Sequence, residues 1–203
     1  MRKIRFYYDV VCPYSYLESH EVEAAEDVGA VDVEWLPFEL RPAPAPLLEV
    51  RGDHLRTDWT GHVYRRALER GIEIHLPRYQ PRSTLPLAAC LWAGEQGRLR
   101  AFKHALYEAF FCEGEDIATD AEIARAAGRA QLDPSEALAA AYSADRLERI
   151  REIRGVPSLL TAEGESHWGM GGVERLLAGH PLQPRPRRAI QSSGSSELAS
   201  EGR

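Results

Sequence analysis

The chain contains few cysteines, and they show no pairing pattern. Only three of its 203 residues are cysteine, namely Cys12, Cys90 and Cys112, and they are far apart in sequence. An odd number of widely spaced cysteines argues against a framework of structural disulfides and fits a reducing compartment. The sequence also has no C-x-x-C or H-x-x-x-H spacing, so we predict no metal site.

Other absences exclude whole classes of partner. Acidic residues outnumber Lys and Arg by 31 to 25, which gives a formal net charge of −6 and no basic surface for nucleic acid. No apolar run is long enough to span a membrane, and the N-terminus enters a strand pattern without the apolar stretch of a secretory signal. We therefore expect no nucleic-acid partner, no membrane partner and a cytoplasmic location.

The most informative motif is Cys12-Pro13-Tyr14-Ser15, which lies between a short apolar run and a helical pattern. Unpaired N–H groups and the helix dipole favour a thiolate at a helix start, and proline suits the first helical position. We predict a reactive Cys12 whose pKa is lowered by the helix start and by the Ser15 hydroxyl. The alternative is an inert cysteine, buried as a small apolar side chain.

The spacing of apolar residues predicts a βαβ unit at the N-terminus and strands again near the C-terminus. The first unit is a strand at 3–9, a helix at 13–28 and a strand at 31–36. A proline-rich loop follows, and residues 53–154 then show helical patterns throughout. The five predicted helices there are 57–70, 83–96, 98–112, 119–129 and 134–153. After them we predict strands at 156–161 and 166–169 and a helix at 173–178.

This order of elements predicts an α/β thioredoxin fold (βαβ … ββα) interrupted by an all-helical insertion. Residues 1–40 and 155–180 would form the thioredoxin-fold domain, and residues 53–154 the helical insertion domain. The C-terminal residues 181–203 are rich in Pro, Arg, Ser and Gly, and we predict that they form a disordered tail.

The sequence resembles the DsbA-like thioredoxin superfamily. Within it, the chain is most similar to the branch of FrnE-type oxidoreductases, 2-hydroxychromene-2-carboxylate isomerases and kappa-class glutathione transferases. The similarity extends to about residue 178 and is carried by five short stretches. These are Tyr8 to Leu17, Leu36 to Pro42, Ala109 to Ile117, Arg154 to Ser158, and Trp168-Gly169.

The resemblance implies a cis peptide between Val156 and Pro157. The Val156 backbone would then face the active sulfur, and an extended thiol such as glutathione, or a peptide, could pair with it as an added strand. From the residues alone, this segment predicts a turn before an edge strand. The N–H groups of Gly171 and Gly172, at a predicted helix start, could bind a substrate carboxylate.

The motif also departs from the family pattern, since oxidoreductases of this branch carry Cys-Pro-x-Cys and the isomerases usually carry Ser-Pro-Tyr-Ser. Our first hypothesis is a thiol–disulfide oxidoreductase or thiol transferase that acts through Cys12 alone. Ser15 replaces the second cysteine, so an external thiol must release the product. Tyr14 and Ser15 would shape the site, with Pro13, Val156 and Pro157 presenting the substrate. A resolving role for Cys90 or Cys112 is disfavoured, because both lie on predicted buried helix faces.

Two alternatives remain. The chain could be a glutathione-dependent isomerase or transferase for an aromatic or polyketide-like molecule, in which Ser15 or Cys12 binds the cofactor thiolate. Its apolar pocket would use Trp59, Trp92, Phe110 and Phe111, although such aromatics are more often plain core. The chain could also be a non-catalytic module that binds peptides. In each case we predict no covalently bound cofactor. The predicted partner is a low-molecular-weight thiol such as glutathione, or a small-molecule or peptide disulfide. The chain could also form a homodimer.

Overall fold

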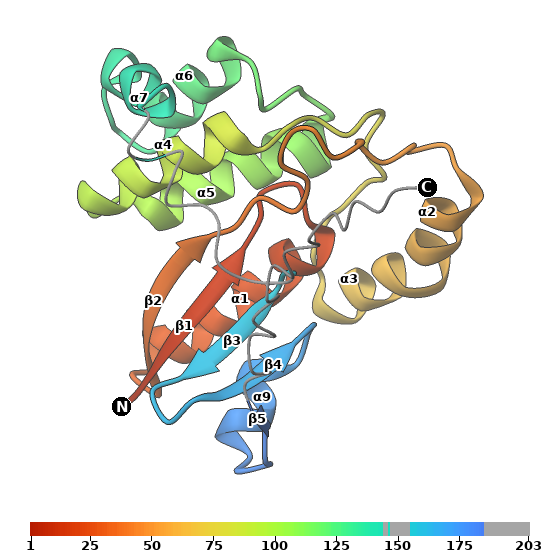
Figure 1. The fold of residues 1–203 in the computed structure, drawn as a ribbon, viewed down its shortest axis with the longest axis vertical. Helices are drawn as coiled ribbons and strands as arrows, with labels where there is room; N and C mark the ends of the chain where they lie inside the picture. The colour runs from red at the N-terminus through yellow and green to blue at the C-terminus, as the bar shows by residue number, and fades with distance from the viewer. Residues whose placement is uncertain (144–145, 147–154, 185–203) are drawn as a thin grey trace, which may run out of the picture.

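The computed structural model describes residues 1–143, 146 and 155–184, which form a five-stranded sheet and a set of helices. The strand order is β2-β1-β3-β4-β5 (Figure 1). Helices α4 to α7 form a layer beyond the carboxyl ends of β1 and β2, and the α2–α3 arm lies to one side of it (Figure 1). This is the predicted α/β thioredoxin fold with a helical insertion, and the prediction is confirmed. None of the described helices is both long and apolar enough to cross a membrane.

The N-terminal βαβ unit follows the sequence prediction closely. It consists of β1 (Arg2–Tyr8), α1 (Pro13–Asp27) and β2 (Val31–Pro37). The two strands are parallel, and Tyr8 pairs with Pro37 at their carboxyl ends. Because these ends meet at one edge of the sheet, the loop that carries Cys12 lies beside the start of the proline-rich loop, and Phe38 N–H donates to the Tyr8 carbonyl at 2.8 Å.

The C-terminal part completes the sheet. It contains β3 (Ser158–Thr161), β4 (Glu165–Trp168) and α9 (Gly172–Leu177). Strand β3 is antiparallel to β1 and pairs Ser158 with Tyr7, which brings Val156 and Pro157 to the sheet edge where Cys12 lies. A further short strand, β5 (Gln183–Pro184), pairs with β4. The predicted disordered tail is therefore wrong at these two residues, and 185–203 lie outside the described residues.

The helical insertion has the predicted helices, with two local differences. The described helices are α2 (Asp53–Asp58), α3 (Tyr64–Arg70), α4 (Thr84–Glu95), α5 (Leu99–Glu108), α6 (Asp120–Arg129) and α7 (Pro134–Ala141). The predicted helix at 57–70 begins earlier, at Asp53, and contains the π-helical segment η1 (Trp59–Val63). A second π-helical segment, η2 (Ala109–Glu113), continues α5. The predicted helix at 134–153 is described only to Ala141, and most of its remainder lies outside the described residues.

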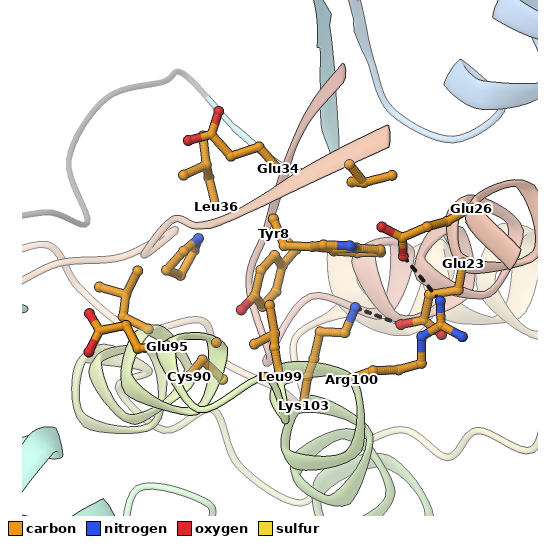
Figure 2. Close-up of a pocket in the computed structure, with 16 residues that line it drawn as sticks. Tyr8, Glu23, Glu26, Glu34, Leu36, Cys90, Glu95, Leu99, Arg100 and Lys103 are labelled. Carbon is orange, nitrogen blue, oxygen red and sulfur yellow. Dashed lines mark hydrogen bonds and ion pairs between the residues drawn. The ribbon is translucent and has the colours of Figure 1, made fainter. Parts of the chain in front are cut away.

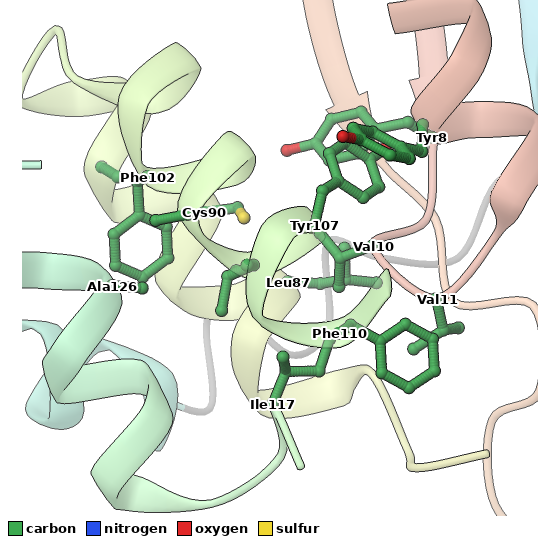
Figure 3. Packing of buried hydrophobic residues seen from close by; sticks show 14 of the residues in the cluster. Tyr8, Val10, Val11, Leu87, Cys90, Phe102, Tyr107, Phe110, Ile117 and Ala126 are labelled. Atoms are coloured by element: carbon green, nitrogen blue, oxygen red, sulfur yellow. The ribbon is translucent and has the colours of Figure 1, made fainter. Parts of the chain in front are cut away.

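The core joins the helical layer directly to the loop that carries Cys12. Figure 3 shows Tyr8, Val10 and Val11 facing side chains of α4, α5 and η2, among them Leu87 and Tyr107. These side chains are buried, so the end of β1 is fixed by apolar packing from the insertion. The position of Cys12 therefore depends on both parts of the fold.

Candidate functional site

Cys12 caps the N-terminus of α1, as its sequence context predicts. Its φ and ψ of −95° and 114° are extended, and Pro13 occupies the first helical turn. The Cys12 sulfur accepts a hydrogen bond from the Ser15 N–H at 3.4 Å. The backbone N–H of Cys12 donates to the Asp9 carbonyl at 3.1 Å, and this hydrogen bond fixes the turn between β1 and α1.

The predicted lowering of the Cys12 pKa is wrong for this structure. Cys12 is only 4% exposed, and burial raises the pKa of its thiol to about 11. Hydrogen bonds from Ser15 lower that pKa and the charge of Asp9 raises it, but desolvation is the largest effect. At neutral pH the resting sulfur is therefore a thiol, and it donates to the Val156 carbonyl at 3.7 Å.

The peptide between Val156 and Pro157 is cis, as the family resemblance implies. Beside it, Gly155 packs so closely against the Trp168 indole that a Cβ at position 155 would lie 2.9 Å from Nε1. The Trp168 side chain is nevertheless 75% exposed. A large aromatic surface thus lies open to solvent next to the Val156 backbone.

Cys12 borders a mostly apolar cavity of about 360 Å³. Its walls come from the Cys12 loop, the proline-rich loop, the α2–η1 segment, the loop before α4, and the Val156 and Trp168 strand ends. Tyr14, in the Cys12 motif, donates from its hydroxyl to Asp58 of α2 at 2.8 Å, which ties the motif to the insertion. The lining residues are Val11, Cys12, Pro13, Tyr14, Leu40, Arg41, Leu48, Val50, Leu55, Asp58, Trp59, Pro77, Gln80, Pro81, Ser83, Val156 and Trp168.

The structure brings most of the predicted site residues together. Cys12, Pro13, Tyr14 and Val156 line the cavity, and Pro157 forms the cis peptide beside it. Ser15 is fully buried behind the sulfur, where its hydroxyl accepts from the Asp9 N–H at 3.4 Å. Ser15 can therefore stabilise the sulfur from behind but does not face a substrate.

Gly171 and Gly172 do not offer the free N–H groups that their sequence context suggested. Both donate to the carboxylate of Glu18, at 2.8 and 3.0 Å, and Glu18 is itself buried in α1. This internal carboxylate occupies the position predicted for a substrate carboxylate. The substrate-binding prediction for these two glycines is therefore wrong, and their N–H groups instead join α9 to α1.

The predicted aromatic pocket is mostly core. Trp59 lines the Cys12 cavity, whereas Trp92, Phe110 and Phe111 are buried and do not line it. Sequence reasoning also missed Asp9 and Asp58. The signal for Asp9 was present, because a carboxylate between Tyr8 and Val10 interrupts an otherwise apolar run.

The other two cysteines lie away from this cavity. Cys90 in α4 is buried and lines a separate cavity of about 590 Å³ between β2 and the α4–α5 pair (Figure 2). Cys112 in η2 donates to the Glu73 carbonyl at 3.4 Å. That neither cysteine resolves a disulfide at Cys12 stays a prediction.

The separate cavity is larger, but its buried cation already has partners. Lys103 forms an ion pair with Glu23 at 2.8 Å, and its Nζ lies 3.3 Å from the centroid of the Trp35 ring. Burial lowers the Lys103 pKa to about 8, although the charge of Glu23 raises it. At the rim, Arg100 pairs with Glu26 and Asp27. We therefore take the Cys12 cavity as the candidate active site.

Comparison with known proteins gives one family match and one curated relative. A family model described as the DSBA-like thioredoxin domain matches residues 3–178. The uncharacterized protein YwbO of Bacillus subtilis (strain 168) is 32% identical over 117 residues, which cover 56% of this chain and 58% of that protein. The chain thus spans less than two thirds of the length of this curated relative.

Solved structures of similar fold belong to both chemical branches. A probable DsbA oxidoreductase from Streptomyces coelicolor has a TM-score of 0.73 and 20% identity, with 100% of both chains covered. A 2-hydroxychromene-2-carboxylate isomerase has a TM-score of 0.70 and 19% identity, covering 87% of this chain and 91% of its own. The cytosolic disulfide reductase DsbM from Pseudomonas aeruginosa, solved with GSH, has a TM-score of 0.65 and 20% identity, covering 86% and 92%.

Identities this low show the fold alone, so the family assignment rests on the family model. That match includes strands β1 to β4, the Cys12 motif and the described helices of the insertion. The chain therefore belongs to the family of DSBA-like thioredoxin domains, as its sequence predicts.

Proposed function

We propose that the protein is a thiol–disulfide oxidoreductase or thiol transferase that acts through Cys12 alone. The observation that carries the proposal is the Cys12 sulfur at the start of α1, on the wall of an apolar cavity and facing the Val156 carbonyl at 3.7 Å. Ser15 stands where a second cysteine would be, so the motif cannot close a disulfide of its own.

The reaction has two exchange steps. After losing its proton, the Cys12 sulfur attacks a disulfide R–S–S–R′ and forms a mixed disulfide Cys12–S–S–R, while the other half leaves as a thiolate that takes up a proton and becomes R′–SH. A second thiol, R″–SH, then attacks the mixed disulfide and gives R–S–S–R″, and its proton returns to the Cys12 sulfur. Glutathione or another low-molecular-weight thiol is our proposal for R″–SH, because DsbM was solved with GSH.

The resting thiol must lose its proton for this attack. The Ser15 N–H, at 3.4 Å from the sulfur, is in place to stabilise the anion once it forms. A disulfide substrate with an apolar group would fill the cavity, and its backbone could pair with Val156 as an added strand. Such a strand would compete with Cys12 for the Val156 carbonyl and free the sulfur for attack.

A glutathione-dependent isomerase or transferase is the second candidate. It is favoured by the mostly apolar cavity, which Trp59 and Trp168 line and in which the exposed Trp168 ring supplies aromatic surface for a small molecule. Since Ser15 is buried behind the sulfur, Cys12 would be the group that binds the glutathione thiolate.

We also propose a cytoplasmic location, which the three free cysteines support. A homodimer remains a further proposal.

The test compares Cys12→Ser with the control variant Cys90→Ala/Cys112→Ala. Each protein is mixed with glutathione disulfide, the adduct is located by mass spectrometry, and turnover is followed with 2-mercaptoethanol as the second thiol, so that the exchange yields a mixed disulfide distinct from the substrate. We expect the control to form one adduct, on Cys12, and to turn over, whereas Cys12→Ser does neither. Unchanged exchange in Cys12→Ser would refute the proposal. A control protein without adduct or turnover would favour the isomerase or the peptide-binding module.

A further inference from the structure

Asp9 is a buried acid directly behind the Cys12 cavity. It follows β1, lies three residues before Cys12, and its side chain is 0% exposed. We infer that Asp9 is a positioning residue that joins three walls of the Cys12 cavity through one carboxyl group. The inference rests on the proposed thiol chemistry of Cys12 and assigns a role to a residue that the exchange reaction itself does not use.

The geometry is a set of hydrogen bonds from three separate segments. The Val11 N–H, in the loop that carries Cys12, donates to Oδ1 of Asp9 at 3.2 Å. The Leu40 N–H, in the proline-rich loop, donates to Oδ2 at 2.8 Å. The Ser83 hydroxyl, just before α4, is the third partner. All three donor residues line the Cys12 cavity, whereas Asp9 itself does not.

One buried group thus fixes the spacing of three walls around one sulfur. None of these segments is a neighbour of another in sequence. Two of them, the loop that carries Cys12 and the proline-rich loop, place their donor residues outside any strand or helix. A carboxylate that accepts several N–H and O–H donors away from water is a strong local anchor. The width of the cavity beside Cys12 should therefore depend on this carboxyl group.

The charge of Asp9 is also coupled to Cys12. Burial raises the pKa of Asp9 to about 7, and its three hydrogen-bond donors oppose that shift. The titratable groups that interact electrostatically with Asp9 are Tyr8, Cys12, Glu39, Cys90 and Tyr107. Because the Asp9 carboxylate raises the pKa of Cys12, ionised Asp9 opposes the thiolate, and loss of its charge favours it.

The main experiment measures the rate of Cys12 alkylation by iodoacetamide from pH 5 to 10, in a Cys90→Ala/Cys112→Ala background. Wild-type Asp9 should give a break in the log rate near pH 7, because the carboxylate that forms there suppresses the thiolate. Asp9→Asn should remove the break and react faster above it, because no carboxylate charge then opposes the thiolate. Below the break the two proteins should react alike.

Glu39→Gln is the matched control. Glu39 is also a buried carboxylate in the proline-rich loop, but it accepts from the Thr84 hydroxyl at 2.6 Å and does not line the cavity. This variant should keep the break, moved to lower pH because the charge of Glu39 raises the pKa of Asp9. An Asp9→Asn profile that matches wild type, break included, would overturn the inference.

A second measurement covers the case in which Asp9→Asn does not fold. Both the Val11 and the Leu40 amide donate to the same carboxyl group, so their NMR shifts in the otherwise unaltered chain should titrate together, with one midpoint near pH 7. Different midpoints, or no titration of either amide, would refute a shared anchor.

Failure of the inference can be told apart from failure of the proposed function. Alkylation and amide titration need no disulfide substrate, so they test Asp9 even if no disulfide exchange occurs. If exchange does occur, Asp9→Asn should raise the KM for glutathione disulfide at pH 8, where the wild-type carboxyl is ionised, because an Asn amide cannot accept from both N–H donors. A change in kcat alone, with KM and the alkylation profile unchanged, would contradict a positioning role.

Discussion

Replacing Glu18 by Gln should destabilise the fold much more than the same change elsewhere on α1. The Glu18 carboxylate is 1% exposed and accepts the N–H groups of Gly171 and Gly172. A glutamine amide has a single acceptor oxygen, so one buried N–H would face an NH₂ group and lose its partner. An unsatisfied buried donor costs about 1–3 kcal/mol.

The assay is urea unfolding followed by circular dichroism, with thermal unfolding as a second readout. For a chain of this size, about 2 kcal/mol corresponds to a fall in Tm of about 4–8 °C. Glu21→Gln is the control, because Glu21 lies on the same helix but is 47% exposed in its ion pair with Arg70. That pair should contribute little. Equal stability of the Glu18→Gln and Glu21→Gln proteins would refute the assigned role of Glu18 in seating α9 on α1.

Two further predictions concern Glu23 and Tyr14. Burial raises the Glu23 pKa, but the hydrogen bond from His104 and the charge of Lys103 outweigh it and lower that pKa to about 2. Because the folded-state pKa is depressed, Glu23 stabilises the fold above about pH 4.5, and about 3 kcal/mol should be lost as pH falls towards 2. Urea unfolding of wild type and Glu23→Gln at pH 2 to 6 checks this, and parallel pH profiles would contradict it. Tyr14→Phe removes the 2.8 Å hydrogen bond to Asp58, which should cost about 1 kcal/mol and raise the KM for glutathione disulfide about fivefold with kcat unchanged. Steady-state kinetics against Tyr64→Phe, which alters a tyrosine outside the cavity, tests this, and equal KM values would count against the tether.

Local features of the fold could be predicted from the sequence because they depend on nearby residues. The alternation over residues 31–36 predicted a strand, which the structure extends to Pro37, and the Thr119 and Asp133 caps predicted two helix starts. The cysteine at the start of α1 was predicted for the same reason, since a proline follows it directly. Such signals involve residues only a few positions apart.

The properties of the site could not be predicted because they depend on residues distant in sequence. The Cys12 pKa is set by burial, and the side chains that pack around Cys12 include Val156 and Leu160, which are far away in the sequence. The carboxylate that occupies the Gly171 and Gly172 amides comes from Glu18, about 150 positions away. The role of Asp9 likewise appears only when the proline-rich loop and Ser83 are brought beside β1.

The hydrogen bond from the Cys12 thiol to the Val156 carbonyl affects which oxidants can react with Cys12. A protonated, buried sulfur reacts slowly with peroxide, because both thiolate character and access govern entry to the sulfenic-acid ladder. A disulfide that fills the cavity and claims the Val156 carbonyl would release the same sulfur. The site would then select its oxidant by shape and backbone pairing, and Cys12 would survive oxidative stress that inactivates an exposed thiolate.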